Sequence, residues 1–281
     1  TVVIFRNYFF KGQIPFPANL LVATYAPWRA YPWEGYPRGP ANKPIGFDDL
    51  RLFYPYRRLT IDQLKAGQWP LWNPYNFSGN VHLATYQAAV FYPLNLFYFI
   101  LPQIDAWSFL VVLQPILAGF FMYLFLKEIN LSKKASFFGS LAFAFSGWML
   151  VWVEEDLVKE HTFLWLPIIL YSVERIFKKV SLKNIVLLVL ATTTSILAGF
   201  LQLTLYILVT VFAWVIFRGK KLATLSLAFF FSFLLSAVHI WPALEAYFAS
   251  PRGLADAKLP RLYLLTCPWY LITYLPEDFH L

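Results

Sequence analysis

The chain has 281 residues, of which 59% are apolar and 14% are charged, whereas soluble globular proteins carry about 25% charged residues. This composition excludes a soluble domain and an intrinsically disordered chain, and the lone Cys267 excludes a disulfide scaffold. The formal net charge is +8, which we assign to membrane-flanking loops rather than to nucleic-acid binding. We therefore expect an all-α polytopic membrane protein.

The first 88 residues differ from the rest of the chain. Residues 6–88 are rich in Pro, Gly, Asn, Tyr and Trp, and none of their apolar runs reaches the ~20 residues that a helix needs to cross a bilayer. We expect them to form one large extramembrane loop. The chain begins at Thr1 rather than at Met, so we expect residues 1–5 to be a remnant of a first transmembrane helix and the chain to be a fragment of a longer one.

Apolar runs dominate residues 89–281, which we expect to form a bundle of transmembrane helices. The main runs cover residues 106–126, 135–153, 162–177, 185–217, 222–244 and 262–275. Residues 89–104 form a shorter run that contains Pro93 and Pro102. We expect an interfacial or re-entrant segment there rather than a crossing.

The short connections between these runs carry charges that predict the orientation. Three connections are basic, and they contain Lys127, Lys133 and Lys134, then Lys178, Lys179 and Lys183, then Arg218, Lys220 and Lys221. The connection 154–161 is acidic instead. Short basic loops stay on the cytoplasmic side, so we expect the acidic connection and loop 6–88 to lie outside.

The run 185–217 is too long for one ordinary span, and both of its ends are basic. An even number of crossings would keep both ends on the same side. We therefore expect a hairpin of two short helices that turns near Gly199. One long tilted helix is the alternative.

Two adjacent carboxylates, Asp48 and Asp49, mark the outer loop, and three arginines follow them at Arg51, Arg57 and Arg58. One carboxylate can act as general base toward an acceptor hydroxyl, and a pair can hold a divalent cation such as Mg or Mn. Guanidinium groups match phosphate. This set suits a lipid-phosphate donor at the outer leaflet, although an Asp pair is also typical of a helix cap or a solvated turn.

The acidic connection supplies a second group of candidates on the same side. Glu154 and Glu155 could share a cation with the Asp pair, and His161 could contact a phosphate or a sugar hydroxyl. A solvated loop that contributes to orientation is the alternative.

A few polar residues interrupt the apolar runs. Gln202 and Tyr206 lie four residues apart and share one helix face, while His239 and Glu245 belong to the run near residue 240. Ionisable groups within a membrane are functional candidates, although many pair with a neighbour instead. A place at the outer interface is the alternative for Glu245.

The outer-loop string Gly67-Gln68-Trp69-Pro70-Leu71-Trp72-Asn73-Pro74-Tyr75 resembles the bacterial YfhO membrane proteins. Further matching positions follow in order, among them Phe91-Tyr92-Pro93, Phe145-Ser146-Gly147, His161, Trp165-Leu166-Pro167, Gly199, Gln202, Tyr206, His239 and Glu245. Two positions depart from the family pattern. Phe47-Asp48-Asp49 stands where the family often has Ser-Asp-Val, which leaves both Asp48 and Asp49 as the matching residue, and Phe200 stands where His often follows Gly.

The resemblance implies a GT-C-like transmembrane helix bundle with a large first extracytoplasmic loop, in the bacterial cytoplasmic membrane. It implies Asp48 or Asp49 as the catalytic carboxylate, a polyprenyl-phosphate sugar as donor and a cell-envelope glycan or polymer as acceptor. We expect the substrates and surrounding membrane lipids to be bound by Arg51, Arg57, Arg58, Trp72, Asn73, Tyr75, His161, Gln202, Tyr206, His239 and Glu245.

Two other functions fit the same residues. A transporter or flippase of a lipid-linked envelope intermediate would use the basic outer loop together with Gln202, Tyr206 and His239. Transporters often carry inverted repeats, and the chain shows no second copy of either region. A non-catalytic envelope assembly protein would tolerate the loss of both Asp48 and Asp49.

Overall fold

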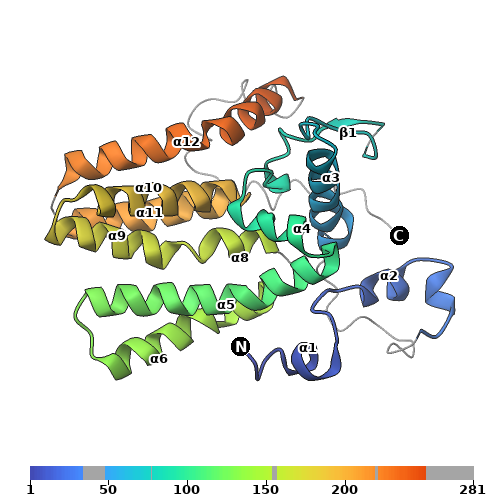
Figure 1. Ribbon diagram of the computed structural model, residues 1–281, viewed down its shortest axis with the longest axis horizontal. Coiled ribbons are helices and arrows are strands. Elements are labelled where there is room, and N and C mark those ends of the chain that lie inside the picture. Colours follow the sequence, from blue (N-terminus) through green and yellow to red (C-terminus); the bar gives the residue numbers. More distant parts are fainter. Residues whose placement is uncertain (34–47, 77, 154–156, 219–220, 251–281) are drawn as a thin grey trace, which may run out of the picture.

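The computed structural model describes residues 1–33, 48–76, 78–153, 157–218 and 221–250 (Figure 1). These residues form helices and a single two-stranded sheet. Four helical stretches among them are long and apolar enough to cross a membrane, and they are Gln103–Glu128, Lys133–Trp152, Leu201–Arg218 and Leu222–Ala249. The expected all-α membrane bundle is thus confirmed, while the expected run 262–275 lies outside the described residues.

The bundle is built on two sets of helix contacts. Helix α5 (Gln103–Glu128) packs along α6 (Lys133–Ala144), which α7 (Gly147–Trp152) continues. Helix α10 (Leu182–Leu197) lies against α12 (Leu222–Ala249) and also against α9 (Leu166–Lys178). The largest core cluster joins α5 to α9, α10, α11 (Leu201–Arg218) and α12 through apolar side chains.

The expected run 162–177 is not one helix. It is divided between α8 (Leu157–Phe163) and α9 (Leu166–Lys178). Pro167 stands in the first turn of α9, where its missing N–H costs nothing, whereas the same proline would break a continuous helix. Because α9 has 13 residues, it is too short to cross a bilayer alone.

The run 185–217 forms two helices, as predicted. Helix α10 ends at Leu197 and α11 (Leu201–Arg218) begins four residues later. Gly199 lies between them with a φ of 102°, a backbone conformation that favours glycine. The chain therefore turns at the expected residue.

The helix ends that flank the three basic connections lie at the same end of the bundle, on the left in Figure 1, which we call the basic end. Lys178 Nζ lies 2.8 Å from a Glu128 carboxylate oxygen. Buried Glu174 accepts hydrogen bonds from Trp214 Nε1 at 2.8 Å and from Arg218 at 3.1 Å. These contacts fasten α5, α9 and α11 together at the basic end.

The described part of residues 1–100, which we call the outer segment after the side on which we expect it, forms shorter elements at the end of the bundle opposite the basic end. They are α1 (Arg6–Lys11), α2 (Asn19–Thr24), η1 (Trp28–Ala30), η2 (Asp49–Phe53), α3 (Tyr54–Lys65), β1 (Trp72–Asn73), β2 (Asn80–Val81), η3 (Tyr86–Ala88), η4 (Pro93–Leu96) and α4 (Phe97–Ile100). None of these is long enough to cross a membrane. The extramembrane side of this segment stays a prediction.

Candidate functional site

The two candidate carboxylates have opposite environments. Asp48 is exposed, whereas the side chain of Asp49 is 0% exposed at the start of η2. Helix η2 packs against α3 and α8, so Asp49 lies where the outer segment meets the bundle. Of the two, Asp48 is therefore the carboxylate that a substrate can reach without rearrangement.

Tyr98 lies within the electrostatic reach of two buried charges, Asp49 and Arg57. Burial raises the pKa of the Tyr98 hydroxyl, the Arg57 charge lowers it, and the Asp49 charge raises it. The hydroxyl is itself buried and has no hydrogen-bond partner within the described part of the chain. A carboxylate and a guanidinium thus share one poorly solvated region at the end of the bundle opposite the basic end.

The three arginines occupy different places. Arg57 is buried, and its Nη1 donates to the carbonyl oxygens of Ala88 and Gln87. Arg58 is exposed and pairs with Asp62 one turn later on α3, at 2.6 Å. These arginines therefore do not form one phosphate clamp, and Arg57 holds main-chain carbonyls instead.

Arg51 is the remaining arginine, and it is exposed near Asp48. Its Nε donates to the Tyr25 hydroxyl at 2.8 Å, and its guanidinium lies 5.6 Å from the centre of the Tyr25 ring. Asp48 and Arg51 are three residues apart and both reach the surface. Solvent therefore reaches both Asp48 and Arg51.

His161 is buried within a hydrogen-bond chain. Its Nε2 faces the Leu110 carbonyl at 3.4 Å, so this nitrogen donates, and Nδ1 accepts from the Tyr92 hydroxyl at 2.8 Å. The Tyr92 hydroxyl in turn accepts from Trp165 Nε1 at 3.3 Å. Both ring nitrogens of His161 thus have protein partners, which differs from the expected contact with a phosphate or sugar.

His239 also holds the main chain. Its Nε2 donates to the carbonyl of Tyr86 at 3.0 Å, and its ring lies 4.6 Å from the Tyr86 ring. The Tyr86 hydroxyl donates to the Ile196 carbonyl on α10. Residues 86–92, which we call the anchored segment, are therefore held by α3, α8, α10 and α12.

The predicted pair Gln202 and Tyr206 does share one face of α11. Gln202 Nε2 donates to the Tyr206 hydroxyl at 2.8 Å, and both side chains are exposed. Glu245 is exposed as well, near the end of α12. These three residues lie on the surface and do not join the buried cluster around Arg57.

The string Gly67–Tyr75, which we call the aromatic string, leads into and forms part of a β-hairpin. Trp72 and Asn73 pair with Val81 and Asn80 as β1 and β2. Asn73 is buried, and its Oδ1 accepts from the Tyr75 backbone N–H at 2.9 Å. The side chains of Trp72 and Tyr75 are exposed, so two of the three predicted contact residues are accessible and Asn73 shapes the turn.

The described residues do not supply a complete set of ligands for the predicted cation site. Glu154 and Glu155 lie outside the described residues. Within the described ranges, no three His, Cys, Asp or Glu side chains come close enough together to hold a metal ion. Asp48 and Asp49 also differ in exposure, which does not favour joint coordination of one ion.

Sequence reasoning missed a buried polar pair in the bundle. Glu160 accepts a hydrogen bond from Gln114 Nε2, and both side chains are fully buried. A solvated loop was one interpretation of the acidic connection 154–161, and it would have exposed Glu160. In the structure Glu160 lies in α8, and its side chain is buried. Gln114 was visible in the sequence as a polar residue within an apolar run.

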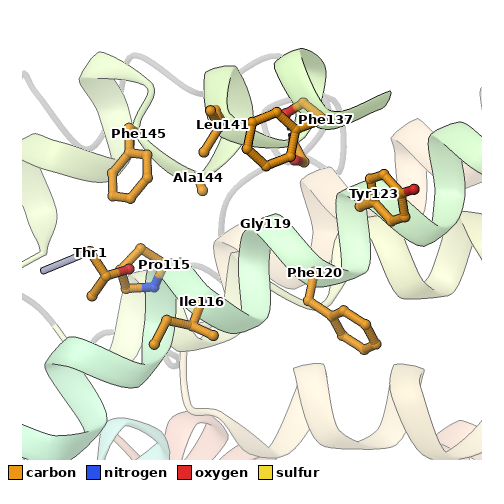
Figure 2. Close-up of a pocket in the computed structure, with 11 residues that line it drawn as sticks. Thr1, Pro115, Ile116, Gly119, Phe120, Tyr123, Phe137, Leu141, Ala144 and Phe145 are labelled. Carbon is orange, nitrogen blue, oxygen red and sulfur yellow. Dashed lines mark hydrogen bonds between the residues drawn. The ribbon is translucent and has the colours of Figure 1, made fainter. Parts of the chain in front are cut away.

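An apolar pocket between α5 and α6 is separate from these residues (Figure 2). It is lined by Thr1, Pro115, Ile116, Gly119, Phe120, Tyr123, Phe137, Ser140, Leu141, Ala144 and Phe145. Its walls carry no ionisable group other than Tyr123 and the amino terminus of Thr1. The pocket offers no chemistry to the predicted reaction.

One family model matches the chain, that of the bacterial membrane protein YfhO, over residues 79–270. No curated protein and no solved structure matches. The match includes the anchored segment, His161 and His239. It begins after Asp48, Asp49, the three arginines and the whole string Gly67–Tyr75, so the roles of those residues stay predictions.

Proposed function

The chain belongs to the YfhO family of bacterial membrane proteins, and from this premise we propose that it is a membrane glycosyltransferase. It moves a sugar from a polyprenyl-phosphate donor to a cell-envelope acceptor, at the outer face of the cytoplasmic membrane. The proposal is supported most by one observation. An exposed carboxylate, Asp48, borders a poorly solvated region that contains Asp49 and Arg57.

The proposed reaction uses the exposed carboxylate. The acceptor hydroxyl oxygen attacks the anomeric carbon of the donor sugar, and the bond from that carbon to the phosphate oxygen breaks. Asp48 takes the hydroxyl proton, and polyprenyl phosphate leaves with the bonding electrons. Attack opposite the leaving group inverts the anomeric centre. General-base catalysis of this kind contributes roughly 10²- to 10⁴-fold in rate.

The charged neighbours have separate roles in the proposal. Arg51 is exposed three residues after Asp48 and stabilises the leaving phosphate, where a fixed positive charge in a partly desolvated site is effective. Buried Arg57 and Asp49 position this region without touching substrate. Arg57 does so through the carbonyls of the anchored segment.

The test measures transfer from labelled polyprenyl-phosphate sugars by the full chain in membranes. We expect Asp48→Asn to lower transfer by about 100-fold or more with an unchanged unfolding midpoint. Asp49→Asn should lower the unfolding midpoint, because it leaves the buried Arg57 charge without the carboxylate that shares its region. Asp62→Asn is the matched control, since Asp62 is exposed on the neighbouring helix α3, and it should retain transfer.

Two outcomes would contradict the proposal. Native transfer by Asp48→Asn would exclude Asp48 as the general base. Absence of transfer with every donor would exclude the glycosyltransferase function. The second candidate is then a transporter or flippase of a lipid-linked intermediate. It is favoured by Glu160 and Gln114, because a fully buried carboxylate within a membrane bundle is typical of a transport path.

A further inference from the structure

The hairpin that carries the aromatic string is rigidly built. The strands β1 and β2 pair with each other, and Gln63 Nε2 on α3 donates to the Trp72 carbonyl at 3.0 Å. Gly79 has a φ of 118°, and a Cβ at this position would collide with the Trp72 ring. The Trp72 ring therefore lies directly on the glycine backbone, which fixes its orientation.

This rigid hairpin presents three aromatic rings to solvent. The exposed fractions are 67% for Trp69, 51% for Trp72 and 82% for Tyr75. Exposed apolar side chains that cluster on a folded surface mark interaction sites more often than chance. Because the backbone is held in place, little conformational freedom would be lost when a ligand stacks on these rings.

The hairpin carries no charge. Residues 66–81 contain no Asp, Glu, Lys or Arg, although they contain the amides Gln68, Asn73, Asn76 and Asn80. The basic residues Arg51, Arg58 and Lys65 belong to η2 and α3 instead. A phosphate-bearing polymer would be bound through cations, so this surface suits an uncharged ligand.

The hairpin lies at the end of the bundle opposite the basic end. Along the long axis of the molecule in Figure 1, β1 lies past the right-hand end of α12 and about level with the right-hand end of α5. An aromatic belt at the headgroups would also lie level with the helix ends, so such a belt is the alternative to a ligand site.

We propose that this hairpin binds uncharged sugar units of the acceptor glycan. A pyranose ring presents C–H groups that stack on an aromatic face, and its hydroxyls pair with the exposed amides of Gln68 and Asn80, because an amide both donates and accepts hydrogen bonds. The inference rests on the proposed function, to which it adds the class of acceptor. Trp69 and Tyr75 supply stacking surfaces, and Trp72, whose ring is held on Gly79, supplies a fixed one.

The experiment measures saccharide binding to the full chain in lipid nanodiscs by calorimetry. The probes are the neutral oligosaccharides maltotetraose and chitotetraose, with glycerol 3-phosphate as the anionic comparison. We expect saturable binding of a neutral probe, weakened about threefold to tenfold by Trp69→Ala and by Tyr75→Ala. Trp28→Ala and Tyr31→Ala are matched controls, because both residues are exposed aromatics outside the hairpin, and they should bind as the native chain does.

A second measurement tests the headgroup alternative. A nitroxide label on Tyr75→Cys, in a Cys267→Ala chain that has no other thiol, should be reached by a water-soluble relaxation agent. Preferential contact with a lipid-soluble agent would overturn the inference, because it would place the hairpin in the bilayer. No binding of either neutral probe, or equal loss in the hairpin and control variants, would also overturn it.

The two proposals fail separately. Neutral-saccharide binding that depends on Trp69 and Tyr75, in a chain that transfers no sugar, would sustain the hairpin as a saccharide site but would exclude the transferase and, with it, the acceptor role of that site. Transfer that depends on Asp48, without such binding, would sustain the transferase and remove the hairpin as the acceptor site.

Discussion

His239 on α12 donates a hydrogen bond from Nε2 to the main-chain carbonyl of Tyr86, 153 residues earlier, at 3.0 Å. The neighbouring carbonyls of Gln87 and Ala88 accept from Arg57 on α3. The same short segment is thus held from a membrane-spanning helix and from the outer segment. This arrangement ties the outer segment to the bundle at the place where the charged residues gather.

The first prediction concerns the anchor supplied by α12. Replacing His239 with Leu leaves the part-buried carbonyl of Tyr86 without this donor, which we expect to cost about 1–3 kcal/mol. His239→Gln, whose amide can donate, should recover part of the loss. Thermal unfolding in detergent measures both effects.

The control for this prediction is Glu245→Gln, which changes an exposed residue of the same helix and should leave the unfolding midpoint unchanged. Equal midpoints for His239→Leu and the native chain would show that the hydrogen bond does not stabilise the fold.

The topology was predictable because its signals are local in the sequence. Basic connections and apolar runs predicted which helices meet at the basic end, and the two basic ends of the run 185–217 predicted the turn at Gly199. The split between α8 and α9 was missed because apolar composition outweighed Pro167. Apolar composition indicates that a segment lies in lipid or in a core, but it does not indicate where one helix ends and the next begins. A proline can do so, because a helix tolerates it best in its first turn.

The candidate site was predictable in residue type but not in arrangement. Arg57 and Arg58 are adjacent and chemically identical, yet one is buried on main-chain carbonyls and the other is exposed beside Asp62. Which face of α3 meets the bundle depends on tertiary packing, and no single-sequence pattern reports it. His161 was likewise expected to face substrate, whereas its partners lie 51 and 69 residues away in the sequence.

The second prediction follows from that difference between the arginines. Arg57→Met leaves two carbonyls of the anchored segment without a buried donor, and we expect a loss of about 2–4 kcal/mol in unfolding free energy. Arg58→Met removes an exposed ion pair and should cost no more than about 1 kcal/mol. Denaturant unfolding of the two variants provides a matched comparison.

The result that would contradict this prediction is a stable Arg57→Met protein with weakened donor binding. Arg57 would then contact the donor phosphate, as first expected from the sequence, and the conformation described here would have to open before the donor binds.

The third prediction concerns the turn between α10 and α11. A Cβ on Gly199 would lie 2.9 Å from Ala89 Cβ and 3.1 Å from the Tyr86 carbonyl oxygen, and the φ of 102° is itself unfavourable for alanine. We expect Gly199→Ala to cost about 2 kcal/mol or more. Gly147→Ala is the matched control, because a Cβ there meets nothing within 4 Å.

Hydrogen exchange of the anchored segment gives a second measurement of the same change. Faster exchange in residues 86–92 of Gly199→Ala, with native exchange in Gly147→Ala, is the expected pattern. Native exchange in both variants would mean that the turn does not support the anchored segment.

The last prediction is a pH dependence that arises at His82, which lies outside the candidate spans. Its Nε2 lies 2.8 Å from Thr60 Oγ1, and burial together with the Arg57 charge lowers the pKa of His82 to about 4. The unfolded chain takes up a proton near pH 6.5, whereas the folded chain does so near pH 4. Stability from His82 is therefore present above pH 6.5 and is lost as the pH falls toward 4, by an amount on the order of 3 kcal/mol. Unfolding midpoints at pH 7, 5.5 and 4.5 should fall less steeply in His82→Asn than in the native chain, and parallel pH profiles would exclude His82 as the source.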